Sequence, residues 1–197
     1  MLMTSDLGPR PRHRNGPDRV RLACRLREAG PRPSRAIMYQ FAPSADSAKP
    51  ELYRELHDAV AAITADELDG VANMANCAAL LWQFVPRLNW AGFYRAIDGQ
   101  LVLGPFVGQP ACIRIAWGQG VCGTAAASAA TQLVPDVHAF PGHIACDAAS
   151  RSELVVPVIR DGAVVAVIDL DSPEPDRFDA DDAAGIEAVA ALLAGRI

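Results

Sequence analysis

The strongest structural signal in the chain is the pair Asp161-Gly162, which separates two apolar runs near the C-terminus. Glu153–Ile159 before it and Ala163–Leu170 after it are rich in valine and isoleucine, the β-branched residues that favour strands. Asp-Gly between two such runs is typical of a two-residue hairpin, because both residues tolerate the positive φ that the turn requires. We therefore expect an antiparallel strand pair here, and any fold for this chain must accommodate it.

Helical patterns precede and follow the strands. Pro50 lies in a first helical turn, and the apolar residues after it recur at helical spacing: Leu52, Leu56, Ala59, Val60 and Ile63. Thr64 and Glu67 form the S/T-x-x-E pattern of a capping box and predict a second helix that ends at Pro86. The stripe of this second helix is Leu68, Val71, Ala75, Ala79 and Trp82. Apolar residues continue around it, so we expect burial on more than one face, within the fold or against a second subunit.

A second hairpin candidate joins Trp90–Arg95 to Leu101–Phe106 through Asp98-Gly99, and Thr131–Val134 is a further short strand candidate. A closing helix begins near Asp179. This order of elements predicts the α+β class, with one central antiparallel sheet, helices packed on one face and a loop-rich side. The 197 residues suffice for a single domain, which we expect over residues 38–197.

Charge is distributed unevenly along the chain. Residues 1–37 contain nine arginines and three acidic residues, whereas residues 38–197 contain nine basic and twenty acidic residues. We expect the first segment to be a disordered Arg- and Pro-rich extension upstream of a true start at Met38, with an organellar transit peptide as the alternative. The acidic body argues against a nucleic-acid partner, and no apolar run predicts a secretory signal or a membrane span. These features predict a cytoplasmic protein.

Three of the five cysteines lie in the glycine-rich middle of the chain, at Cys112, Cys122 and Cys146. Packing in a core is the ordinary use of a free cysteine, but turn-rich segments have less packing to do. A zinc site with His138 or His143 is a second interpretation, although the spacing lacks the tight ligand pairs of most zinc sites. A redox site is the third, because a sulfenic acid needs a second thiol to resolve it before further oxidation. The cysteines alone leave all three open.

Acidic residues on the predicted hairpin add to the redox interpretation. Asp169 and Asp171 alternate along the last strand and therefore share one face, and Glu153 opens the partner strand. Carboxylates that converge beside thiols would bind a cation and keep at least one acid protonated by mutual repulsion. A solvated sheet edge is the alternative, but the VIDLD segment is mostly apolar, and acids that face inward need a partner.

Five segments together resemble the free methionine-(R)-sulfoxide reductases, a family with the GAF fold: NWAGFY (89–94), LVLGPFVGQPACIRI (101–115), GQGVCGTA (118–125), DVHAFPGHIACDAASRSEL (136–154) and VIDLDS (167–172). The resemblance implies reduction of free L-methionine (R)-S-oxide to methionine through a cysteine sulfenic acid and an intramolecular disulfide. It implies that thioredoxin reduces this disulfide, that no cofactor or resident metal takes part, and that the protein is a homodimer.

The same resemblance implies roles for individual residues. Cys146 corresponds to the catalytic cysteine that attacks the sulfoxide, Cys112 to the principal resolving cysteine and Cys122 to an additional one. Trp90 and Tyr94 match the aromatic pair that packs against the S-methyl end of the substrate. The residues that match the substrate-binding carboxylates are Glu153, Asp169 and Asp171. The alternative function is a non-catalytic GAF module that binds a small molecule or senses redox state.

Overall fold

The computed structural model describes residues 41–45, 47–142 and 148–197, so the predicted extension over residues 1–37 lies outside the described residues. A six-stranded sheet in the order β3-β2-β1-β6-β5-β4 organises the described chain, and every neighbouring pair is antiparallel. The strands are β1 (Trp90–Ile97), β2 (Gln100–Gly108), β3 (Arg114–Ala116), β4 (Gln132–Val134), β5 (Ser152–Arg160) and β6 (Ala163–Ser172). The α+β class predicted from the sequence is confirmed.

Both predicted hairpins form. Asp161 and Gly162 have φ values of 52° and 79°, and Asp98 and Gly99 have φ values of 49° and 75°. Two successive positive φ values define the primed turn that matches the twist of the flanking strands. The two turns therefore set the starting register of the β5–β6 and β1–β2 pairs.

Strand β6 contains one residue more than β5 across their pairing. Val158 pairs with Ala166 and Ile159 pairs with Val164, so Val165 is the extra residue of a β-bulge. Beyond the bulge the register runs without a shift to the end of both strands. The bulge thereby decides which face of the sheet each side chain in the second half of β6 occupies.

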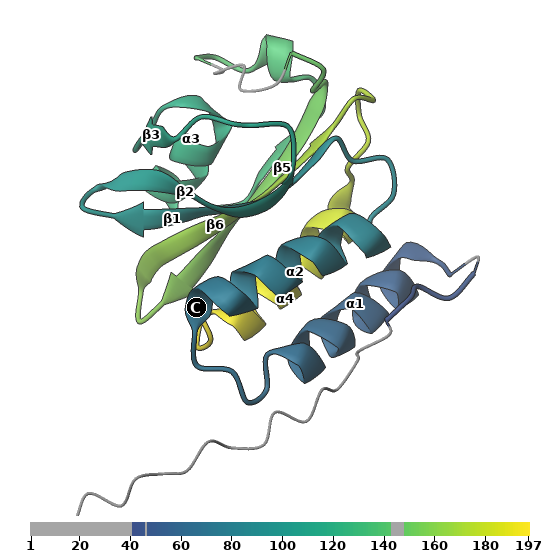
Figure 1. Cartoon of the computed structure of the whole chain (residues 1–197). Coiled ribbons are helices and arrows are strands. Elements are labelled where there is room, and N and C mark those ends of the chain that lie inside the picture. Colours follow the sequence, from purple (N-terminus) through teal and green to yellow (C-terminus); the bar gives the residue numbers. More distant parts are fainter. Residues whose placement is uncertain (1–40, 46, 143–147) are drawn as a thin grey trace, which may run out of the picture. The chain divides into compact units, whose positions relative to one another are not determined.

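Three helices lie on one side of the sheet, which we call the helix face (Figure 1). They are α1 (Lys49–Ile63), α2 (Gly70–Phe84) and α4 (Ala180–Leu193). Helices α2 and α4 pack against the strands, and α1 packs on these two helices. The fully enclosed side chains of this core include Leu56, Leu81, Phe93, Ile168 and Leu193. Each such side chain contributes roughly 1.5–3 kcal/mol on transfer from water. None of the helices in the described ranges is long and apolar enough to cross a membrane.

The start and the orientation of α2 differ from the prediction. The Asp69 side chain accepts hydrogen bonds from the amides of Val71 and Ala72, so the helix begins at Gly70. Thr64 instead ends α1, where its hydroxyl donates to a backbone carbonyl in the preceding turn. The predicted stripe is exposed along its length: Leu68, Val71, Ala75, Ala79 and Trp82. The buried stripe is Met74, Cys77, Ala78, Leu81 and Phe84. Apolar residues surround the helix, so periodicity alone could not select the inner face.

The middle of the chain contains a helix that the sequence did not predict. Gly120–Ser128 forms α3, which lies on the opposite face of the sheet from the other three helices (Figure 1). This segment consists of small residues without an apolar stripe, so no helical period was visible. Gly123 permits its close approach to β3, because a Cβ there would lie 2.4 Å from the Ala116 carbonyl oxygen. We call this side of the sheet the α3 face.

Candidate active site

Three acidic side chains converge on the α3 face. Glu153 on β5 pairs in register with Asp171 on β6, and Asp169 lies two residues earlier on β6. Because side chains alternate along a strand, the two aspartates share a face, and the register places Glu153 beside them. Glu153 and Asp169 are each only 6% exposed. The strand register therefore gathers carboxylates from two strands into a buried group.

Helix α3 adds a thiol to this group. Cys122 lies in the first turn of α3, is 4% exposed, and donates through Sγ to Oε1 of Glu153 at 3.9 Å. The Cys122 sulfur and one carboxylate oxygen each from Glu153 and Asp169 all lie within 4.8 Å of one another. We call these three residues the thiol–carboxylate cluster. It joins α3, β5 and β6 through side chains that are all buried.

The electrostatics of the cluster favour its uncharged forms. Burial raises the pKa of Glu153 well above its usual value, and the neighbouring charges of Asp169 and Asp171 raise it further. Burial also raises the pKa of Asp169. The Cys122 pKa rises because of burial and the adjacent carboxylates, so this thiol stays protonated at neutral pH. In the described part of the chain, no ion pair compensates Glu153 or Asp169. Glu153 therefore holds a proton at neutral pH, whereas Asp169, whose pKa is raised to about 6, is mostly ionised and would attract a cationic group.

An aromatic stack lies beside the carboxylates. Trp90 stacks on Tyr94 at 5.9 Å between ring centroids and on Phe106 at 5.2 Å, and its Nε1 donates to the Gln109 carbonyl at 3.1 Å. Gly108, with φ 139°, leaves room for the indole, since a Cβ there would lie 2.6 Å from Trp90 Cδ1. Sequence reasoning identified two of these rings and missed Phe106. Its position on β2, paired with Gly92 of β1, becomes visible only with the register.

A small cavity of about 10 Å³ lies between the rings and the acids. Its lining is Trp90, Tyr94, Gln109, Pro110, Ala111, Asp169 and Asp171. Cys112 follows this lining directly in the sequence, is half-buried against the α3-face core, and is disulfide-bonded. Four of the residues predicted for the site, Trp90, Tyr94, Asp169 and Asp171, therefore line one cavity. Cys112 is adjacent to this lining in the sequence, and Glu153 pairs with Asp171 across the strands.

Two of the predicted or considered residues, Cys146 and His143, lie outside the described residues. The described chain resumes at Ala148, and soon after it the Ser150 hydroxyl accepts a hydrogen bond from the Asn89 side chain at 3.0 Å. Asn89 directly precedes Trp90, so the segment that follows Cys146 in the sequence is tied to the start of β1. His138 is exposed and contacts its neighbour Asp136 rather than the cluster.

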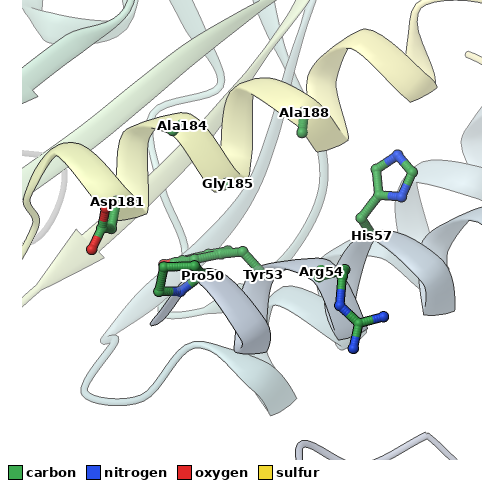
Figure 2. A pocket seen from close by; sticks show the side chains of 8 residues that line it. All are labelled: Pro50, Tyr53, Arg54, His57, Asp181, Ala184, Gly185 and Ala188. Carbon is green, nitrogen blue, oxygen red and sulfur yellow. The ribbon is translucent and has the colours of Figure 1, made fainter. Parts of the chain in front are cut away.

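Larger grooves lie on the helix face and carry different chemistry. A groove of about 410 Å³ runs between α1 and α4, where Tyr53 and Pro50 face the small residues of α4 (Figure 2). Arg54 and His57 border it on the α1 side and Asp181 on the α4 side. No cysteine and no buried acid lines this groove. The buried acid nearest to this groove, Asp182 of α4, is paired with Lys49 and Arg177. Among the described residues, Glu153 and Asp169 on the α3 face are buried acids without such an ion pair.

The chain matches the family model described as GAF domain over residues 57–197. Its fold and buried site thus define a GAF-domain protein, as the sequence predicted. It is 46% identical to the free methionine-R-sulfoxide reductase of Escherichia coli and 41% identical to that of Saccharomyces cerevisiae, each over 74% of this chain and over 88% and 85% of those relatives. The X-ray structure of the Neisseria meningitidis enzyme in complex with its substrate is 45% identical, covers 81% of this chain and 95% of that one, and gives a TM-score of 0.77. Within the GAF class, the chain belongs to the family of free methionine-R-sulfoxide reductases.

Proposed function

We propose that this protein reduces free L-methionine (R)-S-oxide to methionine. The observation that carries the proposal is the pair of buried acids, Glu153 and Asp169, which no ion pair among the described residues compensates and which lies beside an aromatic stack in a chain of this family. A free amino acid offers an ammonium group that these acids can pair with. In a protein the same nitrogen is an uncharged amide, which would leave the buried acids without a partner.

The proposed binding mode uses the two walls of the cavity. Asp169 and Asp171 on β6, with Glu153 opposite, hold the ammonium and polarise the sulfoxide oxygen. Trp90 and Tyr94 pack against the S-methyl end. A protonated carboxyl supplies the proton that the sulfoxide oxygen needs as it leaves, and the raised pKa of Glu153 suits it to that task. We therefore propose that Glu153 is the proton donor and that Asp169 and Asp171 bind the ammonium group.

The proposed chemistry begins with attack of the Cys146 thiolate on the sulfoxide sulfur. Protonation of the oxygen and its transfer to Cys146 release methionine and leave a sulfenic acid. The thiol of Cys112 then attacks the sulfenic sulfur, forms a disulfide and releases water. Cys122 is an additional resolving thiol, and its raised pKa makes it a poor attacking group. The disulfide state of Cys112 supports its assignment to resolution.

The proposed reductant is the dithiol of thioredoxin, which takes up the disulfide bond and restores both cysteines as thiols. This requirement fits a reducing compartment, and we propose the cytoplasm. The activity is tested by NADPH consumption in a coupled thioredoxin assay with free methionine (R)-sulfoxide. We expect turnover with the free (R) epimer and little with the (S) epimer or with N-acetylated methionine sulfoxide. Comparable turnover of the N-acetylated compound would contradict the proposed recognition of the ammonium group.

We also propose that the protein is a homodimer and that the exposed apolar residues of α2, with Leu68 just before the helix, contribute to its interface. Leu68, Val71 and Trp82 are 97%, 49% and 41% exposed, and small residues between them allow a second helix to approach closely. Sedimentation analysis should give twice the chain mass. The variant Val71→Glu should give a folded monomer, whereas Glu51→Gln, at an exposed position of α1, should remain dimeric. A monomeric wild-type protein would contradict the proposal.

A further inference from the structure

The thiol–carboxylate cluster is also a set of possible metal ligands, and the proposed reduction does not use these residues in that way. Cys122, Glu153 and Asp169 each present one ligand atom, one sulfur and two oxygens, and these atoms lie within 4.8 Å of one another. Three protein ligands with one open position is the arrangement in which zinc binds water or a small molecule. The ligands come from α3, β5 and β6, so the packing of the fold positions them together.

A second observation points to a cation at this place. Asp169 is only 6% exposed, and its Oδ1 atom is buried without a hydrogen-bond partner among the described residues. The same side chain lines the small cavity beside Trp90. A buried carboxylate oxygen without a donor is costly, and a metal ion satisfies it more fully than a weak thiol donor can. Asp169 therefore belongs both to the cluster and to the lining of the cavity.

We propose that Cys122, Glu153 and Asp169 form a binding site for a thiophilic divalent cation, with Zn²⁺ as the ion considered. The sulfur binds as thiolate, so one Zn–S bond replaces one S–H bond and a proton leaves to solvent. Any proton held on the two carboxyl groups leaves as well. Mg²⁺ and Ca²⁺ do not fit this set, because they require more oxygen ligands and do not favour sulfur. The sulfur ligand and the small number of ligands therefore favour Zn²⁺ over Mg²⁺ and Ca²⁺ at this site.

Occupancy by the metal excludes the substrate. This part of the inference rests on the proposed function, because the ion takes the carboxylate oxygens that would hold the substrate ammonium. Zn²⁺ therefore inhibits the reductase competitively with free methionine (R)-sulfoxide, and a chelator restores activity. The metal acts as a reversible inhibitor at this site and has no part in turnover.

The test uses Co²⁺, whose bonds to thiolate sulfur give a charge-transfer absorption in the near ultraviolet. The protein is the full chain with Cys24, Cys112 and Cys146 changed to Ser, under anaerobic conditions. This leaves Cys122 and Cys77, and Cys77 is completely enclosed in the helix-face core. We expect the absorption to saturate at one Co²⁺ per chain, to be abolished by Zn²⁺ and to accompany release of at least one proton.

The matched variant adds Cys122→Ser to the same background and should lose the absorption, while its circular dichroism spectrum stays unchanged. Asp169→Asn should weaken Co²⁺ binding at least tenfold. Persistence of the band without Cys122, or no band in its presence, overturns the site. The readout does not depend on catalysis, so absence of reductase activity in the wild-type chain, together with a band in the variant that retains Cys122, contradicts the proposed function and leaves the metal site standing. A band together with non-competitive inhibition by Zn²⁺ overturns the exclusion of substrate.

Discussion

The two faces of the sheet both bury side chains, and they differ in what they bury. On the helix face, Leu56, Leu81 and Ile168 are enclosed in an apolar core that stabilises the fold through transfer from water. On the α3 face, Glu153 and Asp169 are nearly as enclosed, yet both are acids whose pKa values are raised by that burial. One face therefore supplies stability, and the other holds reactive groups in a state that costs stability. Substitutions on the two faces should change different measurements.

The largest expected effect concerns the cysteines. Cys146→Ser removes the proposed nucleophile and should abolish methionine release even in a single turnover without thioredoxin. Cys112→Ser should release about one methionine per subunit and then stall, because attack precedes resolution. Cys122→Ser should be the mildest of the three, and Cys77→Ser should leave turnover intact. The measurement is methionine released per subunit, resolved by chromatography. A full burst from Cys146→Ser with none from Cys112→Ser would exchange the two roles.

The next effect should move activity and stability in opposite directions. Asp169→Asn or Glu153→Gln should lower kcat/KM by about 10²-fold or more, because each removes charge or a proton needed by the substrate. The same changes should raise the melting temperature by about 2–4 °C for each kcal/mol of burial penalty relieved. Calorimetry alongside the coupled assay measures both. A variant that loses stability together with activity would show that these acids support the fold.

The pH dependence of stability provides a sharper form of that test. The raised pKa values mean that the folded state keeps protons on Glu153 and Asp169 that the unfolded chain releases above about pH 4. Stability should therefore fall as pH rises from the ordinary carboxyl range through the raised values. The double amide variant should show a flatter profile over the same window. An identical slope in both proteins would contradict the assigned direction of the shifts.

A substitution on the helix face should give the converse result. Leu81→Ala removes a fully enclosed side chain and should reduce the free energy of unfolding by about 2–5 kcal/mol. The KM for the sulfoxide should stay unchanged at temperatures where the variant is folded. Leu133→Ala, at a side chain that is 42% exposed, serves as the control and should change stability by less than about 0.5 kcal/mol. A raised KM in Leu81→Ala would mean that the two faces are coupled.

A smaller effect is expected at the aromatic stack. Phe106→Leu removes the ring that stacks on Trp90 and should raise KM about two- to tenfold, as expected for an aromatic pair. The value of kcat should change less, because Phe106 is not among the groups proposed to attack the sulfoxide or to protonate its oxygen. Phe106→Tyr should keep both KM and the tryptophan emission of the wild-type protein. An unchanged KM in Phe106→Leu would show that the position of Trp90 does not depend on this ring.

The smallest effect should follow removal of residues 1–37. A chain that starts at Met38 should unfold at the same temperature and turn over at the same rate, because the apolar stripes that predict the core all lie after residue 50. Differential scanning calorimetry and the coupled assay measure the two properties. A large loss in either would make the segment part of the domain.

The sequence predicted best those features that depend on local chemistry. The turn at Asp161-Gly162 and the alternation of Asp169 with Asp171 each follow from a few adjacent residues. Helix α3 and the contact of Phe106 with Trp90 could not be predicted, since the first has no apolar period and the second depends on register between strands. The predicted start of α2 was wrong because the sequence contains two N-cap signals, at Thr64 and at Asp69. Packing decides between them, and the helix begins after Asp69.

The bulge at Val165 has a consequence for how this gene can change. Deleting one residue between the bulge and Asp169 would turn every later side chain of β6 to the other face, because strand side chains alternate. Both aspartates would then enter the apolar core, and Leu170 and Ser172 would take their places beside the cavity. Insertions at the exposed tip Asp161-Gly162 leave this alternation unchanged. Length variation in descendants of this chain should therefore accumulate at the hairpin tip and be purged from the strand, even where each single residue could be replaced.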